Sequence, residues 1–206
     1  MRITSEAKAR TRNRIVDAAR KLFSEKGFDQ TTTRDIAAEA AIAAGTLFNY
    51  FPSKEALGMS LVSEALEGAE ADFQSRRRGY EPLAESLFAY VMAGLHQLAR
   101  YRQAVGPIVE SGLSPFTESA AADGQRLRVA HLEMVAQLIA EDAQTPAPSF
   151  VAMHLYWTLY LGVLAFWSND DSPNQEDTLV VLDQSLRLFV ASLTNDVQMK
   201  EVSRGT

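Results

Sequence analysis

Lysine and arginine residues are unevenly distributed along this chain of 206 residues, and their distribution points to a polyanionic partner. Residues 1 to 54 contain 10 Lys and Arg against 6 Asp and Glu, whereas residues 55 to 206 contain 10 against 20. The net charge of -6 therefore hides a basic first quarter. An acidic protein with one basic segment is suited to present that segment to a phosphate backbone. The cations of the polar first ten residues either reach such a backbone or are simply solvated.

The residues that usually carry catalysis form no recognised pattern here. The three histidines, at positions 96, 131 and 154, lie far apart, and there is no His-Glu-x-x-His motif and no glycine-rich phosphate loop. Residues 112 to 116, Gly-Leu-Ser-Pro-Phe, lack the final glycine of a Gly-x-Ser-x-Gly elbow. The absence of cysteine excludes disulfides and thiol sensing. The sequence predicts no catalytic residue, no metal site and no cofactor.

The basic segment must be presented by helices, and residues 31 to 57 predict two short ones. Thr32 can cap the first helix, with Asp35 three residues later as an Asp variant of the capping box. The second helix is expected over residues 44 to 50, with Leu47 and Phe51 four residues apart on its inner side.

Two helices of this length cannot bury a core alone, so a third helix must pack on them. Residues 12 to 26 supply it, and Gly27 is placed to end it in the left-handed conformation. Its inward face is expected to contain Ile15, Ala18, Ala19, Leu22 and Phe23. Three helices in this order are typical of a helix-turn-helix DNA-binding domain.

The residue order strengthens this interpretation. Residues 31 to 57 contain Thr-Thr-Arg-Asp-Ile-Ala, a turn, Gly-Thr-Leu-Phe-Asn-Tyr-Phe, and then Ser-Lys-Glu-Ala-Leu. This order resembles the DNA-binding signature of the TetR family of bacterial transcriptional regulators, over about residues 10 to 60. The resemblance implies an all-α protein with an N-terminal helix-turn-helix domain (1–53), a connecting helix (54–78) and a C-terminal ligand-binding and dimerisation bundle (79–206).

The resemblance also implies roles for particular residues in binding double-stranded operator DNA. The implied set is Thr33, Arg34, Ala44, Gly45, Thr46, Phe48, Asn49, Tyr50 and Lys54. Thr33, Thr46 and Lys54 would contact phosphate, and Arg34, Ala44, Gly45 and Asn49 would face bases, with arginine suited to guanine and asparagine to adenine. Taken singly, Lys54 is equally a solvated helix start and Thr46 a turn residue. Two positions depart from the family, which usually has tyrosine at Phe48 and glycine at Ala41.

The remaining chain is predicted to be helical throughout. The stretch from Phe150 to Trp167 is 18 residues without a charge, which is at the edge of the length of a membrane span. It lacks flanking Lys or Arg, so we expect a helix buried on all sides rather than a membrane helix. Because the N-terminus has no apolar segment typical of a signal peptide, we expect a cytoplasmic protein.

The last two helices expose more apolar surface than one small domain can cover, which predicts a homodimer. The last helix has leucines at steps of three and four, as in a coiled coil. The predicted interface comprises Leu155, Leu159, Gly162, Phe166, Leu179, Leu182, Leu186, Phe189 and Leu193.

An effector pocket follows from the resemblance, because ligand sites between bundle helices are mostly apolar with a few polar groups. Candidate lining residues are Phe88, Met92, His96, Tyr101, Phe116, His131, Tyr156 and Tyr160. Each is also an ordinary core residue by its spacing.

The function predicted from the sequence is a ligand-responsive regulator, released from DNA by a small apolar or aromatic effector. The alternatives are an architectural DNA-binding dimer without a ligand and, on weaker grounds, an uncharacterised enzyme.

Overall fold

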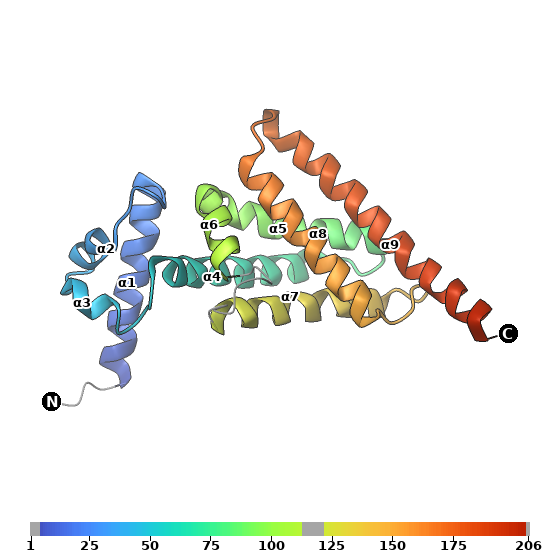
Figure 1. Cartoon of the computed structure of the whole chain (residues 1–206), viewed down its shortest axis with the longest axis horizontal. Helices are drawn as coiled ribbons and strands as arrows, with labels where there is room; N and C mark the ends of the chain where they lie inside the picture. Colours follow the sequence, from blue (N-terminus) through green and yellow to red (C-terminus); the bar gives the residue numbers. More distant parts are fainter. Residues whose placement is uncertain (1–4, 113–121, 205–206) are drawn as a thin grey trace. The chain divides into compact units, whose positions relative to one another are not determined.

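The chain folds into α-helices, as the sequence predicts. The computed structural model describes residues 5 to 112 and 122 to 204, and within these ranges all regular secondary structure is helical (Figure 1). The helices are α1 (Ser5–Lys26), α2 (Thr33–Glu39), α3 (Ala44–Leu47), α4 (Lys54–Arg76), α5 (Leu83–Leu98), η1 (Ala99–Tyr101), α6 (Arg102–Gly112), α7 (Ala122–Glu141), α8 (Phe150–Asn169), η2 (Pro173–Gln175) and α9 (Glu176–Arg204), where η marks a 3-10 helix.

The helices form two compact units that do not follow the chain in linear order. Unit 1 comprises Met1–Glu67 and Leu98–Arg126, and unit 2 comprises Gly68–Gln97 and Leu127–Thr206. Helix α4 therefore contributes its first part to unit 1 and its last part to unit 2. The 3-10 helix η1 packs on α1, which explains why a segment from the middle of the chain groups with the N-terminal helices.

Helix α1 supplies the third helix that the helix-turn-helix plan requires. It begins at Ser5, so much of the polar N-terminal tail is helical rather than extended. Its buried residues include the five predicted for the inward face and also Val16. Gly27 ends the helix with a φ of +83°, in the left-handed region that glycine adopts without steric cost.

A reciprocal pair of hydrogen bonds starts α2 at the predicted position. The Asp35 backbone N–H donates to Thr32 Oγ1 over 3.1 Å, and the Thr32 backbone N–H donates to Asp35 Oδ2 over 2.9 Å. The Thr32 hydroxyl, which donates to Asp35 Oδ2 over 2.7 Å, and the Thr32 backbone N–H lower the pKa of the Asp35 carboxyl, because both bonds favour its charged form. The capping box inferred from the sequence is confirmed.

The turn after α2 places a non-glycine residue in the left-handed region. Ala41 has a φ of +51°. The guanidinium of Arg14, on α1, donates to the backbone carbonyls of Ala40 and Ala41 and so holds this turn. Helix α3 follows and ends at Leu47, three residues earlier than expected, although backbone hydrogen bonds continue the turn as far as Phe51.

Unit 2 has a core built around α8, which is covered on one face only. Seven α8 side chains are buried: Ala152, Tyr156, Trp157, Tyr160, Val163, Leu164 and Trp167. Only 33% of the most apolar α8 window is buried, so the expectation that this helix is covered on all sides is wrong for a single protomer. Among the described helices α8 alone is long and apolar enough to cross a membrane, but core helices of soluble proteins pass the same test.

The carboxylate of Asp170 joins the end of α8 to the start of α9. Its Oδ2 accepts from the Thr178 backbone N–H over 2.9 Å and from Thr178 Oγ1 over 2.5 Å, and its Oδ1 accepts from the Ser172 backbone N–H over 2.9 Å. Hydrogen bonds from Ser172 and Thr178 hold the pKa of Asp170 well below its usual range. The two helices are thus fixed as a pair that lies side by side (Figure 1).

Candidate DNA-binding and effector sites

The turn and α3 present a small exposed face with a firmly packed inner side. Leu47 and Phe51 are buried, whereas Ala44, Gly45 and Asn49 are exposed. Phe48, at the C-cap of α3, is 53% exposed, which is unusual for a phenylalanine. The spacing of Leu47 and Phe51 predicted this division of inner and outer faces correctly.

The other predicted DNA-binding residues lie in the same unit. Arg34 is exposed on α2, and Thr33, Thr46 and Tyr50 are half-buried. All nine predicted residues therefore belong to unit 1. Their chemical types, hydroxyls, an amide and cations beside small residues, suit contacts with phosphates and base edges.

Lys54 has a structural partner that the sequence did not reveal. Its Nζ donates to the Phe28 backbone carbonyl over 2.9 Å and lies 4.2 Å from the centroid of the Phe28 ring. These contacts hold the start of α4 against the loop that follows α1. Because an ammonium carries three donors, this hydrogen bond leaves two for a phosphate.

In unit 2, three of the predicted pocket residues meet in one buried cluster. His131 Nδ1 lies 3.3 Å from Tyr90 Oη, and His131 Nε2 lies 3.0 Å from Tyr156 Oη. The Tyr160 ring stacks on the imidazole with 4.1 Å between centroids. Tyr90 was missed by the sequence analysis, although its position on α5 next to buried Val91 was the available signal.

Burial sets the protonation states in this cluster. It lowers the pKa of His131 to about 3, because the charged imidazolium is poorly solvated there. Burial also raises the pKa values of Tyr90, Tyr156 and Tyr160, so their hydroxyls stay protonated. A neutral imidazole has one donor and one acceptor nitrogen, so one of its two tyrosine partners donates and the other accepts.

Met92 and His96 lie apart from this cluster and line a cavity of about 260 Å³ between the end of α4 and α5. Its walls combine apolar side chains with charged ones. The lining residues are Asp72, Phe73, Arg76, Arg77, Glu81, Glu85, Ser86, Ala89, Met92, Ala93 and His96. We call this space the α4–α5 cavity.

Among the charged residues of the α4–α5 cavity that form an ion pair, Arg77 has the least exposed side chain. Its Nη2 lies 2.5 Å from Glu141 Oε2, and its guanidinium carbon lies 5.7 Å from the centroid of the Phe73 ring. Its Nε is buried and has no hydrogen-bond partner among the described residues. Arg77 is not among the pocket residues predicted from the sequence.

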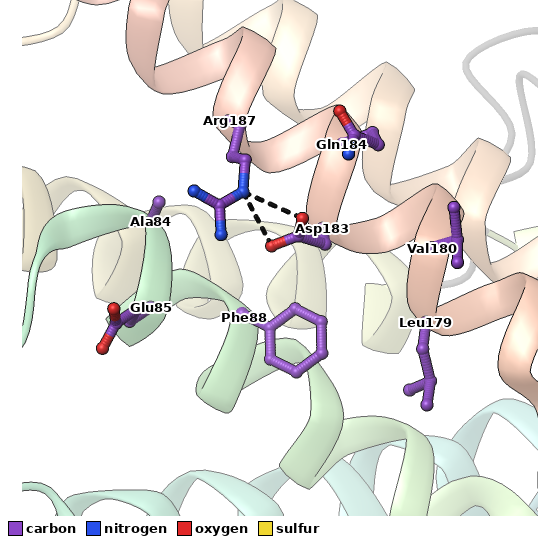
Figure 2. A pocket seen from close by; sticks show the side chains of 8 residues that line it. All are labelled: Ala84, Glu85, Phe88, Leu179, Val180, Asp183, Gln184 and Arg187. Atoms are coloured by element: carbon purple, nitrogen blue, oxygen red, sulfur yellow. Dashed lines mark hydrogen bonds and ion pairs between the residues drawn. The ribbon is translucent and has the colours of Figure 1, made fainter.

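Phe88 lies in a different, more open site, a groove of about 540 Å³ between α5 and α9. Figure 2 shows Ala84, Glu85 and Phe88 from α5 opposite α9, where Arg187 Nε bonds both carboxylate oxygens of Asp183 over 3.0 and 2.8 Å. Leu179 and Val180 complete its apolar part.

The two remaining pocket candidates are not with the others. Tyr101 is buried in unit 1, in η1, and Phe116 lies outside the described residues. The pocket set named from the sequence is therefore divided among the histidine cluster, the α4–α5 cavity, the groove and unit 1.

The predicted dimer residues separate into an exposed and a buried group. Leu155, Gly162 and Phe166 are exposed on α8, and Leu159 and Leu179 are half-buried. The regular row on α9 is packed inside the protomer, with exposed fractions of 1–3%: Leu182, Leu186, Phe189 and Leu193. That row is not available to a second copy, because the protomer already covers it.

Helices α1 to α3 form a three-helix head with an exposed α3, and α4 joins this head to a helical unit with a cavity. This arrangement defines a helix-turn-helix transcriptional regulator. Residues 15–58 match the family described as "Bacterial regulatory proteins, tetR family", and residues 87–204 match the "Tetracyclin repressor-like, C-terminal domain". The chain belongs to the TetR family of bacterial transcriptional regulators.

Individual relatives agree with this assignment. The chain is similar to the HTH-type transcriptional regulator UidR of Escherichia coli K12, with 33% identity over 103 residues, 50% of this chain and 52% of UidR, so it matches about half of that relative's length. The putative mycofactocin biosynthesis regulator MftR of Mycobacterium tuberculosis is 26% identical over 175 residues, 82% of this chain and 85% of MftR.

A solved structure extends the similarity to the whole fold. Thermus thermophilus FadR, a TetR family transcriptional repressor in complex with lauroyl-CoA, has a TM-score of 0.69 and 26% identity, covering 86% of this chain and 92% of FadR.

The buried imidazole of His131 makes the stability of the fold depend on pH. An unfolded histidine binds a proton below about pH 6.5, whereas folded His131 binds one only near pH 3. Its stabilising contribution is complete above about pH 6.5 and is lost as the pH falls towards 3. Between about pH 7.5 and about pH 5, the free energy of unfolding should drop by about 2 kcal/mol more in the wild type than in His131→Gln.

Urea unfolding at both pH values measures this difference. Exposed His154 on α8 provides the matched control, His154→Gln, which should behave as the wild type does. An equal pH dependence in the wild type and His131→Gln would contradict the burial of a neutral imidazole.

Proposed function

We propose that this protein is a ligand-responsive repressor that binds a palindromic operator as a homodimer and is released by a small molecule held in unit 2. The observation that carries the proposal is the exposed face of α3, which is backed by Leu47 and Phe51 and flanked by Lys54 and Arg34. A short helix presented in this way reads base edges in the major groove, while its surroundings grip phosphates.

The homodimer is supported by the apolar side chains that α8 and α9 leave uncovered. On α8, Val151, Leu155 and Phe166 are 73%, 43% and 42% exposed, and their spacing places them on one face with Leu159 and Gly162. On α9, Val180 and Leu188 are 60% and 71% exposed. An exposed apolar row like that on α8 is typical of a protein interface, and a two-fold dimer would present two DNA-binding units to a palindrome.

The effector site that the chemistry favours is the α4–α5 cavity. Its volume of about 260 Å³ is just below the usual range for ligand pockets, about 300 to 1,000 Å³, so it suits an apolar chain or a small ring. Phe73, Ala89, Met92 and Ala93 supply the apolar wall.

Arg77 adds a preference for an oxygen-bearing ligand. A buried guanidinium N–H without a partner costs about 1 to 3 kcal/mol, which an acceptor oxygen on a ligand would recover. An acyl thioester combines an apolar chain with such oxygens. The lauroyl-CoA bound to Thermus thermophilus FadR makes acyl thioesters the first class to test here.

Release would run through α4, which is one continuous helix whose first part belongs to unit 1 and whose last part belongs to unit 2. A ligand at the Phe73 end would displace this helix and the head attached to it. In a dimer the two heads must match a fixed groove spacing, so a small displacement lowers operator affinity.

The main rival function is an architectural DNA-binding dimer without an effector. It shares the head and the exposed α8 surface, and it differs only in the absence of a ligand that changes DNA affinity.

Operator binding tests the reading head. Lys54→Ala should weaken binding to operator and random DNA similarly and flatten the salt dependence by roughly one unit per protomer, because one phosphate contact is lost. Asn49→Ala should instead cost about 1 to 3 kcal/mol per half-site and relax the preference at one base pair. Footprinting and salt titrations on selected DNA measure both effects, and identical losses on all sequences would remove Asn49 from base reading.

Sedimentation of the free protein tests the dimer. The wild type should sediment as a dimer, and Leu155→Glu or Phe166→Glu should shift it to a monomer, because each places a charge in an apolar interface. Phe150→Glu is the matched control, since Phe150 is exposed at the start of α8 on a different face. A wild-type monomer would reject the homodimer.

Ligand titrations with and without operator test the release mechanism. An acyl-CoA that binds should raise the melting temperature and lower operator affinity, and a thousandfold loss requires about 4 kcal/mol of coupling per dimer. Linkage requires saturating operator to weaken ligand binding by the same factor. Titrations with free coenzyme A and with free fatty acids separate the contributions of the coenzyme A group and the acyl chain to binding.

Two variants localise the site. Met92→Trp should fill the cavity and abolish the response, and Arg77→Met should weaken ligand binding. Glu141→Gln breaks the same ion pair but leaves the guanidinium in place, so it should retain the response. If no thioester, acid or aromatic compound changes DNA affinity, the architectural dimer is the better account.

A further inference from the structure

The outer face of α3 contains few groups that can form hydrogen bonds. Backbone bonds from Thr46 N to Ala43 O (2.8 Å), Asn49 N to Thr46 O (3.1 Å) and Phe51 N to Leu47 O (3.0 Å) keep residues 43 to 51 in successive turns. Leu47 and Phe51 take the inner side of these turns. The exposed side consists of Ala44, Gly45, Phe48 and Asn49, and only Asn49 has a polar side chain.

Gly45 is not required by the protein's own structure. A Cβ built at Gly45 would meet no atom within 4 Å, and its φ does not lie in the region that favours glycine. Neither packing nor backbone conformation within the chain therefore explains why this position lacks a side chain. A close approach from outside the protein does explain it, and it would bring Phe48, three residues further along, against the same partner.

Phe48 then has an exposed ring at the surface of closest approach. A phenyl ring cannot donate a hydrogen bond to a phosphate, so its contribution must come from apolar contact. Among the base edges of the major groove, the C5-methyl group of thymine is the apolar feature.

We propose that Phe48 determines part of the operator sequence by packing on a thymine methyl group in each half-site. The proposal rests on the operator binding proposed above and extends it from the position of the head to the identity of a base. The small side chains at Ala44 and Gly45 let the ring approach the groove, and Asn49 supplies a hydrogen bond at a neighbouring base.

The test is to replace thymine by uracil in the operator, which removes only the methyl group. With the wild-type protein, one position in each half-site should show a loss of about fourfold, and substitution in both half-sites should give about 15-fold, as expected for one buried methyl group per half-site. This measurement needs no variant protein, so it does not depend on the folding of a mutant.

Variants at Phe48 then test whether its ring is responsible for the discrimination between thymine and uracil. Phe48→Ala should bind thymine and uracil operators equally, whereas Phe48→Tyr, which keeps the ring, should retain the discrimination. Asn49→Ala is the matched control: it should bind more weakly overall and still discriminate. Melting temperatures of the variants verify that the half-exposed position tolerates the change.

The outcomes are distinct from those of the operator test itself. The proposal is overturned if no thymine position discriminates, or if Phe48→Ala discriminates as the wild type does. In the second case, a loss of overall affinity in Phe48→Ala would mean that the ring packs on sugar or backbone. A protein that binds no operator at all would instead reject the proposed function, and this inference with it.

Discussion

A close contact at Gly58, where helix α4 has no side chain, joins three segments of unit 1. A Cβ at this position would lie 2.7 Å from Ile108 Cδ1 and 3.1 Å from Phe28 Cε2, so these two side chains, from α6 and the loop after α1, pack directly against the backbone of α4, and a larger residue would require them to shift. Phe28 also accepts the Lys54 hydrogen bond on its carbonyl and packs against Phe23 with 5.0 Å between ring centroids. The reading head, the start of α4 and α6 are therefore held at one point, which explains why α6 groups with the N-terminal helices.

Several cations of the N-terminal segment already have partners within the protein, so fewer are available for DNA than the charge excess of the segment suggests. The Arg20 guanidinium bonds both oxygens of Glu64 over 2.9 and 2.8 Å, and Lys21 Nζ lies 2.7 Å from Glu39. Arg14 is committed to the carbonyls of the turn. Exposed ion pairs each contribute less than about 1 kcal/mol, so their main effect is to fix side chains rather than to stabilise the fold. Hydrogen bonds and apolar contacts must supply much of the selectivity of the head.

The features that the sequence predicted well depend on residues close together in the chain. The capping box joins Thr32 to Asp35, and the inner side of α3 follows from Leu47 and Phe51 four residues apart. The features that it missed depend on packing between distant segments. Gly106 and Pro107 usually interrupt a helix, yet they lie inside α6, and Tyr101 is buried in η1. Likewise, helical spacing put aromatic residues on α5, α7 and α8 but could not say which of them would enclose a cavity. That outcome depends on how the helices pack.

The left-handed backbone at Ala41 affects which mutations the helix-turn-helix can accept. An L-residue other than glycine in this conformation carries a strain of about 1 to 2 kcal/mol, and the Arg14 guanidinium holds the turn against it. Alanine and glycine codons differ by a single nucleotide, so Ala41→Gly, which would relieve the strain, is one mutation away. This turn is therefore not at its stability optimum, which is usual for natural proteins. Both the turn and Arg14 on α1 hold α3, so substitutions outside the face proposed to contact DNA can change the angle of α3 without altering the residues proposed to read bases.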